Sequence, residues 1–247
     1  MTATTARPDV ETAAQAPGGD RFLAVAMWVV SGLLLALQVL ALEVIPPLLA
    51  LGVLYIALGV VVARRHARWP HVTAIVLALI HLVGSAPFMA ANLAHPESPG
   101  SFVMEALIAV AILVVLVGAA GGLRGARPRS RRPLALGAAA VAAVAVVVSL
   151  VAAGGVETDR RQPGDVVIES VRSQFPERVE IPAGGAGVWI DNQDPIHHTL
   201  VIEGTNVRAV IPASSAVRSD VALEPGTYQF FCDVPGHEGM QGELVAR

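Results

Sequence analysis

The chain has 247 residues and a formal net charge of −3, with 54% hydrophobic and only 15% charged residues. Its mean hydropathy of +0.61 excludes an ordinary soluble globular protein and predicts a membrane protein. Residues 1–154 contain ten arginines and six acidic residues, whereas residues 155–247 contain seven and fourteen. The net charge is therefore about +4 in the first part and about −7 in the second, which predicts two regions of different kind. The single cysteine, Cys232, excludes an intrachain disulfide.

Five long apolar blocks fill the first region. After a tail over residues 1–21 that we predict to be disordered and cytoplasmic, the blocks are Phe22–Leu42, Ile45–Ala63, Val72–Leu93, Phe102–Gly121 and Leu134–Ala153. Since roughly 20 residues suffice to cross the hydrocarbon core as a helix, we expect a five-helix transmembrane domain over residues 22–154. The first block is expected to be a retained helix, because its apolar run is long and the residues before it are not basic enough for a signal peptide.

Arginines in the connections predict the orientation of these helices. The connection after the second block carries Arg64, Arg65 and Arg68, and the one after the fourth carries Arg124, Arg127, Arg129, Arg131 and Arg132. The alternate connections, around Glu43 and around His95–Ser101, carry none. By the positive-inside rule the arginine-bearing connections are cytoplasmic. The N-terminus is then cytoplasmic, and the region after the fifth helix is extracytoplasmic.

Two ionisable residues lie inside the predicted spans, and such residues are functional candidates by default. His81 and His95 are fourteen residues apart, a spacing seen in membrane cytochromes that bind two haems, but no other span supplies a matching pair. We therefore favour a structural interpretation. We expect His81 to face the bundle interior or a neighbouring helix, and Glu105 to lie in the outer first turn of its helix.

The region after the helices has the pattern of a small β-domain. A polar linker over residues 155–164 precedes short alternating segments that are separated by Gly, Pro, Asn and Asp turns. The predicted strands are Val166–Val171, Arg178–Ile181, Gly187–Asp191, His198–Glu203, Ala216–Leu223, Thr227–Phe231 and Gly242–Ala246. This pattern over residues 165–247 indicates a β-sandwich.

The last of these segments are separated by a group of soft metal ligands. Cys232 is followed by His237 and Met240 within eight positions. Thiolate and thioether ligands prefer copper, and a weak axial methionine is typical of a blue-copper site. The spacing therefore predicts a mononuclear copper site in this domain.

Two stretches of this domain carry a family resemblance. Tyr228–Cys232, Pro235–His237 and Met240–Gly242, together with Asp191–Ile202, resemble the corresponding segments of the cupredoxins, the plastocyanin- and azurin-like blue-copper family. The resemblance covers roughly residues 165–247. It implies an all-β cupredoxin-like Greek-key sandwich over these residues, so together with the apolar blocks the expected fold is a multi-pass α-helical membrane region followed by this sandwich. It also implies one type 1 copper per chain, cycling between Cu(I) and Cu(II), with His198, Cys232 and His237 as equatorial ligands and Met240 as the axial ligand.

The sequence departs from plastocyanin-like members at two points. Four residues separate Cys232 from His237 and two separate His237 from Met240, whereas plastocyanin-like members have the reverse, so Glu238 or a backbone carbonyl remains an alternative axial ligand. Adjacent strand residues point to opposite faces, so we expect only one of His197 and His198 in the site and favour His198. His197 is expected either to face solvent near a docking surface or to be a pH-sensitive neighbour of the copper.

These features favour a one-electron carrier over an enzyme, because no open ligand position is reserved for a substrate. The acidic charge predicts a basic redox partner at the same membrane surface, such as a c-type cytochrome or a terminal oxidase subunit, and no nucleic acid. Copper storage, delivery or resistance, with an exchangeable metal, is the alternative. A third interpretation treats the five-helix region as a permease or sensor, for which the sequence offers no intramembrane polar chain.

Overall fold

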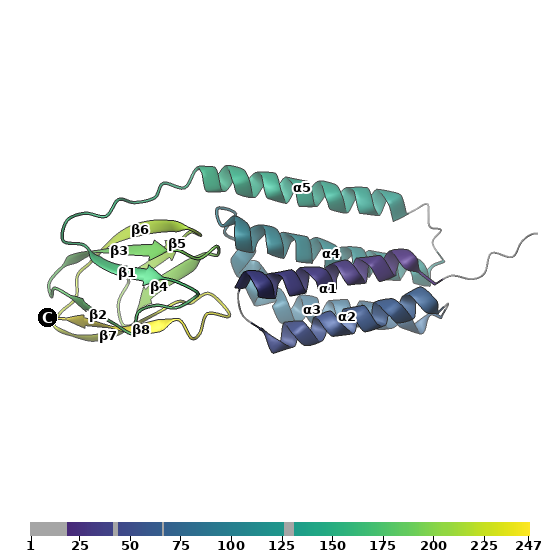
Figure 1. The fold of residues 1–247 in the computed structure, drawn as a ribbon, viewed down its shortest axis with the longest axis horizontal. Coiled ribbons are helices and arrows are strands. Elements are labelled where there is room, and N and C mark those ends of the chain that lie inside the picture. The colour runs from purple at the N-terminus through teal and green to yellow at the C-terminus, as the bar shows by residue number, and fades with distance from the viewer. Residues whose placement is uncertain (1–18, 42–43, 66, 126–130) are drawn as a thin grey trace, which may run out of the picture.

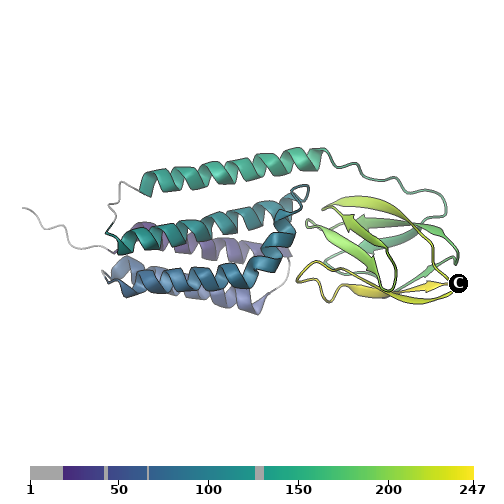
Figure 2. The same ribbon diagram turned by 180° about the vertical axis from the view of Figure 1, so that it is seen from behind.

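The computed structural model describes residues 19–41, 44–65, 67–125 and 131–247, and residues 1–18 of the predicted tail lie outside this part. Figures 1 and 2 show a helical region at one end of the molecule and a β-sandwich at the other. An extended segment after the last helix joins them. The C-terminus lies at the end of the sandwich that is remote from the helices.

The helical region consists of helices at the predicted positions. They are α1 (Arg21–Ala41), α2 (Pro46–Arg64), α3 (Trp69–Leu93), α4 (Pro99–Leu123) and α5 (Arg132–Gly154). A proline occupies one of the first two positions of α2, α3, α4 and α5, where a backbone donor has no partner within the helix. Within the described residues, five helices are long and apolar enough to cross a membrane.

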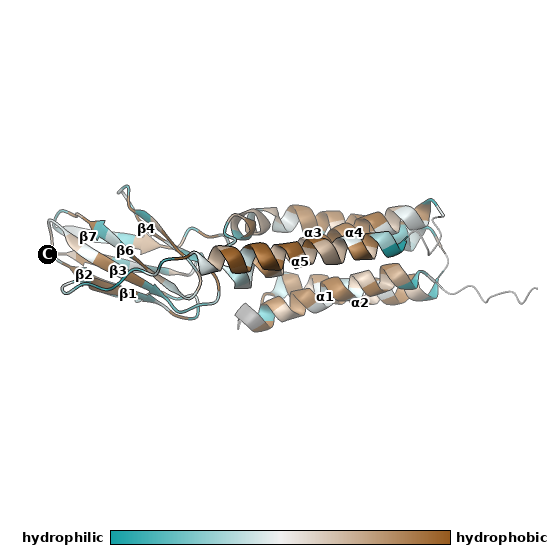
Figure 3. Ribbon diagram, turned by 90° about the horizontal axis from the view of Figure 1, so that it is seen from above, coloured by the Kyte–Doolittle hydropathy of each residue, from teal (hydrophilic) through white to brown (hydrophobic). Residues whose placement is uncertain are grey.

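The first four helices pack around a common apolar core. Helix α1 lies against α2 and α4, and α3 lies against α2 and α4. The largest fully buried side chains of this core include Leu23, Met27, Tyr55, Ile108 and Ile112. Helix α5 packs chiefly against α4, and only 6% of its most apolar window is buried, compared with 44% for α1. The apolar colour of α5 in Figure 3 therefore marks a surface suited to lipid.

The sandwich consists of two sheets. Its strands are β1 (Val166–Ser170), β2 (Arg178–Ile181), β3 (Ala186–Asn192), β4 (His198–Ile202), β5 (Arg208–Ile211), β6 (Ser215–Val221), β7 (Gly226–Phe231) and β8 (Gln241–Ala246). One sheet has the order β1-β3-β6 and the other β2-β8-β7-β4-β5. The pairs β1–β3 and β2–β8 are parallel, and the remaining pairs are antiparallel. Strand β5 is the one that the sequence pattern did not predict.

Alternation of buried and exposed residues places one apolar face of each sheet in the interior. Val188 and Ile190 of β3 and Phe230 of β7 are fully buried, and Phe230 packs against Phe175 with ring centroids 5.5 Å apart. This core extends to Cys232 and Met240, which belong to the same cluster of buried residues. The predicted ligands therefore lie at one end of the hydrophobic core rather than on the surface.

The sandwich meets the helices at the end that carries these residues. In Figures 1 and 2 the β7–β8 connection points toward the helical region. The Ala213 backbone N–H donates a hydrogen bond to Ser98 Oγ in the α3–α4 connection, at 3.1 Å. A Cβ on Gly236, whose φ is +89°, would lie 3.1 Å from the ring of Phe88 in α3. The α3–α4 corner is thus in van der Waals contact with the loops around the predicted site.

Candidate metal centre

Three predicted ligands converge although two different parts of the chain supply them. His198 opens β4, Cys232 directly follows β7, and His237 lies in the β7–β8 connection. One ligand atom from each of them lies within 4.8 Å of the others. The Nδ1 atoms of His198 and His237 are 3.1 Å apart, and His237 Nδ1 is 3.5 Å from Cys232 Sγ. This is a compact His–Cys–His donor set.

Met240 is held beside this set by its backbone. The Cys232 N–H donates to the Met240 carbonyl at 2.9 Å, and the Met240 N–H donates to the His237 carbonyl at 2.9 Å. A third bond runs from the His237 N–H to the Val234 carbonyl at 3.0 Å. The methionine side chain is 1% exposed. The connection is therefore a closed turn that brings the residues of the sequence motif to the same end of the sandwich.

The sulfur of Cys232 receives two contacts from the start of β4. Thr199 approaches it with its backbone nitrogen at 3.4 Å and its hydroxyl at 3.5 Å. The same hydroxyl bonds Asp233 Oδ1 at 2.7 Å and accepts the Asp233 N–H at 2.9 Å. Asp233 is paired in turn with Arg208 at 2.9 Å. This network ties β4 to the residue after the cysteine and fixes the position of the sulfur.

His198 is oriented by a carboxylate that the sequence analysis did not single out. Asp194 Oδ2 lies 2.9 Å from His198 Nε2, which leaves Nδ1 to face Cys232 and His237. Asp194 also accepts hydrogen bonds from the Ser170 hydroxyl and from the backbone N–H groups of Arg172 and Ser173. A carboxylate on the second nitrogen of a metal-binding histidine fixes its tautomer and raises its basicity. The signal in the sequence that could have indicated this contact is the position of Asp194 four residues before His198.

The two imidazoles are poised as neutral donors. Burial, together with the nearby His198, lowers the pKa of His237 to about 4. Burial also lowers the pKa of His198, although the hydrogen bond that its Nε2–H donates to Asp194 opposes this shift. Near pH 7 both rings are therefore neutral, and their Nδ1 atoms lie 3.1 Å apart next to the cysteine sulfur. Two neutral imidazoles, a thiol and a buried thioether fit a copper ion, because imidazole and soft sulfur ligands both suit copper.

His197 does not face solvent, so that expectation was wrong. Its side chain is 1% exposed, and its ring lies 4.4 Å from the ring of His95, at the α3–α4 connection. Its Nδ1 is buried without a hydrogen-bond partner. The expected division of roles between the adjacent histidines is otherwise seen, since His198 joins the donor set and His197 turns toward the helices. The helical region covers this histidine, which a sequence pattern within the β-domain cannot reveal.

The buried groups of the helical region lie apart from this donor set. His81 faces the bundle interior, as expected, with Nδ1 3.4 Å from the Tyr55 hydroxyl. Glu105 lies one turn deeper in α4 than expected, because α4 begins at Pro99, and it accepts a hydrogen bond from Asn92 at 3.4 Å. These are short polar contacts between neighbouring helices.

The combination of two sheets and a donor set at one end matches a known family. A family model described as "Cupredoxin-like domain" matches residues 138–246. The C-terminal domain is a cupredoxin-like domain. The match begins within α5, so it includes most of the last helix, the linker and the sandwich. No curated protein matches the chain.

Solved structures similar to the cupredoxin-like domain include amicyanins. A reduced amicyanin variant is 18% identical, with 36% of this chain and 87% of that chain covered and a TM-score of 0.31. Amicyanin from Paracoccus versutus (Thiobacillus versutus) is 19% identical, with 35% and 85% covered and a TM-score of 0.29. Likeness at this level carries no argument about function, so the family match and the geometry of the domain carry the assignment.

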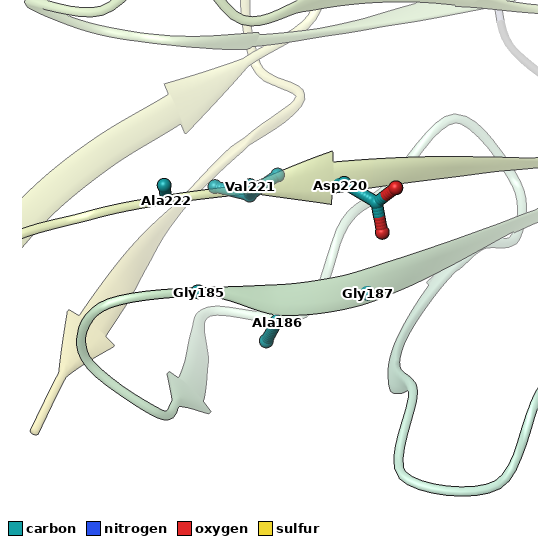
Figure 4. A pocket seen from close by; sticks show the side chains of 6 residues that line it. All are labelled: Gly185, Ala186, Gly187, Asp220, Val221 and Ala222. Carbon is teal, nitrogen blue, oxygen red and sulfur yellow. The ribbon is translucent and has the colours of Figure 1, made fainter.

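A shallow hollow elsewhere on the cupredoxin-like domain offers no comparable chemistry. It lies between β3 and β6 and is lined by Gly185–Gly187 and Asp220–Ala222 (Figure 4). Asp220 is its one ionisable side chain, and this carboxylate is paired with Arg218 at 2.8 Å. Since no other donor converges with it, we assign the hollow no ligand.

Proposed function

We propose that the protein is a membrane-anchored blue copper protein that carries single electrons between redox partners at the extracytoplasmic surface. The observation that carries the proposal is the convergence of His198, Cys232 and His237 within 4.8 Å. We assign these residues as equatorial ligands and Met240 as the axial ligand of one copper ion. Bound there, copper would supply the one-electron Cu(I)/Cu(II) couple.

The surrounding residues suit electron transfer rather than catalysis. Asp194 fixes the ring of His198, and Thr199 fixes the sulfur of Cys232, so the donors are held before any metal arrives. Met240 is buried in the same core cluster as Cys232. Donors held in place in this way favour a change of charge without a change of geometry, which suits electron transfer better than catalysis at an open metal position.

The position of the arginines supports an extracytoplasmic copper domain. Arg64 ends α2, Arg65 and Arg68 lie between α2 and α3, and Arg124 and Arg131 flank the α4–α5 connection. Both connections are at the end of the helical region that is remote from the cupredoxin-like domain (Figure 1). With the arginine-rich end in the cytoplasm, the copper domain is outside. Its charge of about −7 would favour a basic partner such as a c-type cytochrome or a terminal oxidase subunit.

The visible absorption and electron paramagnetic resonance spectra of the full chain loaded with Cu(II) test this proposal. We expect an intense thiolate-to-copper band and a narrow copper hyperfine splitting, both of which are lost in Cys232→Ser. Repeated reduction and oxidation should leave the copper bound. A pale spectrum typical of ordinary Cu(II) sites, or release of copper on reduction, would instead favour the copper-delivery alternative.

A further inference from the structure

The junction between the helices and the cupredoxin-like domain holds a second group of potential metal ligands. The His95 and His197 rings lie 4.4 Å apart with an interplanar angle of 34°. His95 belongs to the α3–α4 connection, and His197 directly precedes the proposed ligand His198. These two histidines come from different parts of the fold, and they meet only because the copper end of the domain rests on this connection.

The hydrogen bonds of the pair leave one donor atom free on each ring. His95 Nδ1 is engaged by Glu97 Oε1 at 2.8 Å, so Nε2 is the nitrogen that remains for a metal. A carboxylate on the other nitrogen is the usual support of a metal-binding histidine. His197 Nδ1 is buried and has no hydrogen-bond partner among the residues that the structure describes. A buried nitrogen without a partner costs free energy, which a metal ion bound to it would offset.

From this geometry we infer a second copper site in which His95 and His197 bind a cuprous ion on its way to the proposed centre. Two imidazoles with no further strong donor suit Cu(I), which accepts low coordination numbers, whereas Zn²⁺ in protein sites takes four ligands. The carboxylate of Glu97 would compensate the positive charge of the ion. The inference rests on the proposed function, because it supplies the metal of the proposed type 1 centre.

The exposed fractions of these side chains indicate the order in which an ion from solvent would meet the two histidines. The side chains of His95 and Glu97 are 25% and 24% exposed, whereas His197 is 1% exposed and His198 is fully buried. A cuprous ion would therefore meet His95 first and then His197, whose ring lies at the same junction as the loops around the proposed centre. Each step exchanges one nitrogen ligand for another, and the ion remains Cu(I), so no electron donor or acceptor is needed.

The test measures the number of Cu(I) ions that the full chain binds in detergent without oxygen, against a chromophoric Cu(I) chelator. We expect two ions in the wild type and one in His95→Phe, which keeps an aromatic ring against His197. Glu97→Gln should reduce the affinity for the second ion by about 10–100-fold. After oxidation both variants should keep the thiolate-to-copper band, because the ligands of the proposed type 1 centre are unchanged.

A variant at the same junction distinguishes the loss of a metal ligand from a weaker contact between the helical region and the cupredoxin-like domain. Ser98→Ala removes the acceptor for the Ala213 N–H and should weaken the contact between the two regions without removing a metal ligand. It should still bind two ions. A loss of the second ion in Ser98→Ala as large as that in His95→Phe would overturn the assignment of His95 as a ligand.

Filling kinetics give a second readout. When apo-protein is mixed with Cu(I), quenched with excess chelator and oxidised, His95→Phe should fill the type 1 centre about tenfold or more slowly, as expected when a metal ligand is lost. One ion in the wild type, or two ions in His95→Phe, would refute the second site. Two ions in a wild type that develops no thiolate-to-copper band would instead refute the proposed type 1 centre while the second site stands.

Discussion

Asp194→Asn should weaken copper binding strongly, because four donors depend on the carboxylate. Oδ2 receives the Ser170 hydroxyl at 3.0 Å, the Ser173 N–H at 2.9 Å and His198 Nε2 at 2.9 Å, and Oδ1 receives the Arg172 N–H at 2.6 Å. An asparagine has one carbonyl oxygen. In its better orientation the asparagine places its carbonyl oxygen at the Oδ2 position and keeps the three hydrogen bonds there. Its NH₂ group then faces the Arg172 N–H, which loses its acceptor.

The magnitude follows from these contacts. One part-buried N–H loses its acceptor, at a cost of about 1–3 kcal/mol, and the other three bonds lose the assistance of a negative charge, at a further cost of about 2 kcal/mol in total. We expect the apo-protein to lose about 3–5 kcal/mol of stability. The support of His198 by Asp194 is the part that acts on the metal, and its loss should reduce copper affinity by about 10–100-fold.

Competition with a Cu(I) chelator and thermal unfolding of the apo-protein measure the two effects. Asp191→Asn is the matched control, because this carboxylate accepts one exposed bond from Gln193 at 3.2 Å and touches no proposed ligand. Its copper affinity should be that of the wild type. If Asp194→Asn behaved like Asp191→Asn in both assays, the carboxylate would not be the support of His198.

Three further changes test other contacts. Thr199→Val removes the hydroxyl that donates to Asp233 Oδ1 at 2.7 Å and accepts the Asp233 N–H at 2.9 Å, so thermal unfolding of the apo-protein should show a loss of about 1–3 kcal/mol, and an unchanged stability would contradict this network. The hydrogen bond from the Arg208 guanidinium lowers the pKa of Asp233 below its ordinary value of 3.8. The stability that Asp233 contributes is therefore present above that pH and is lost as the pH falls further. The stability of apo-protein carrying Asp233→Asn should then change less with pH, between pH 5 and about 3, than that of the wild type. Gly100→Ala places a Cβ against a backbone carbonyl of the cupredoxin-like domain and should increase amide hydrogen exchange at the junction, whereas Gly84→Ala in open space should not.

Features set by neighbouring residues in the chain could be predicted from the sequence. The apolar blocks become helices because a run of about 20 apolar residues satisfies its backbone internally. The group from Cys232 to Met240 could be interpreted because three backbone hydrogen bonds close it into one turn. The alternation of side chains along a strand limited the site to one of His197 and His198, and the resemblance to the cupredoxins favoured His198.

Features that depend on distant segments could not be predicted. Strand β5 has four residues at a sheet edge and shows no clear alternation, with Arg208 exposed and only Ile211 fully buried. The role of Asp194 requires the turn at Arg172 and Ser173, where φ is 55° at both residues and brings two N–H groups to the carboxylate. Nothing in the local pattern marks this turn as part of the site.

The contact between the two regions gives the helical part a use that a single anchoring helix would lack. Phe88, His95 and Ser98 all belong to the α3–α4 corner, and each touches or bonds a loop next to the proposed ligands. The position of this corner depends on α3 and α4 packing against each other and on α1 and α2 completing the core. A lone helix could tether the copper domain, but it could not present three side chains at fixed positions to the copper end. The packing of the bundle therefore fixes which side chains meet the loops around the proposed ligands.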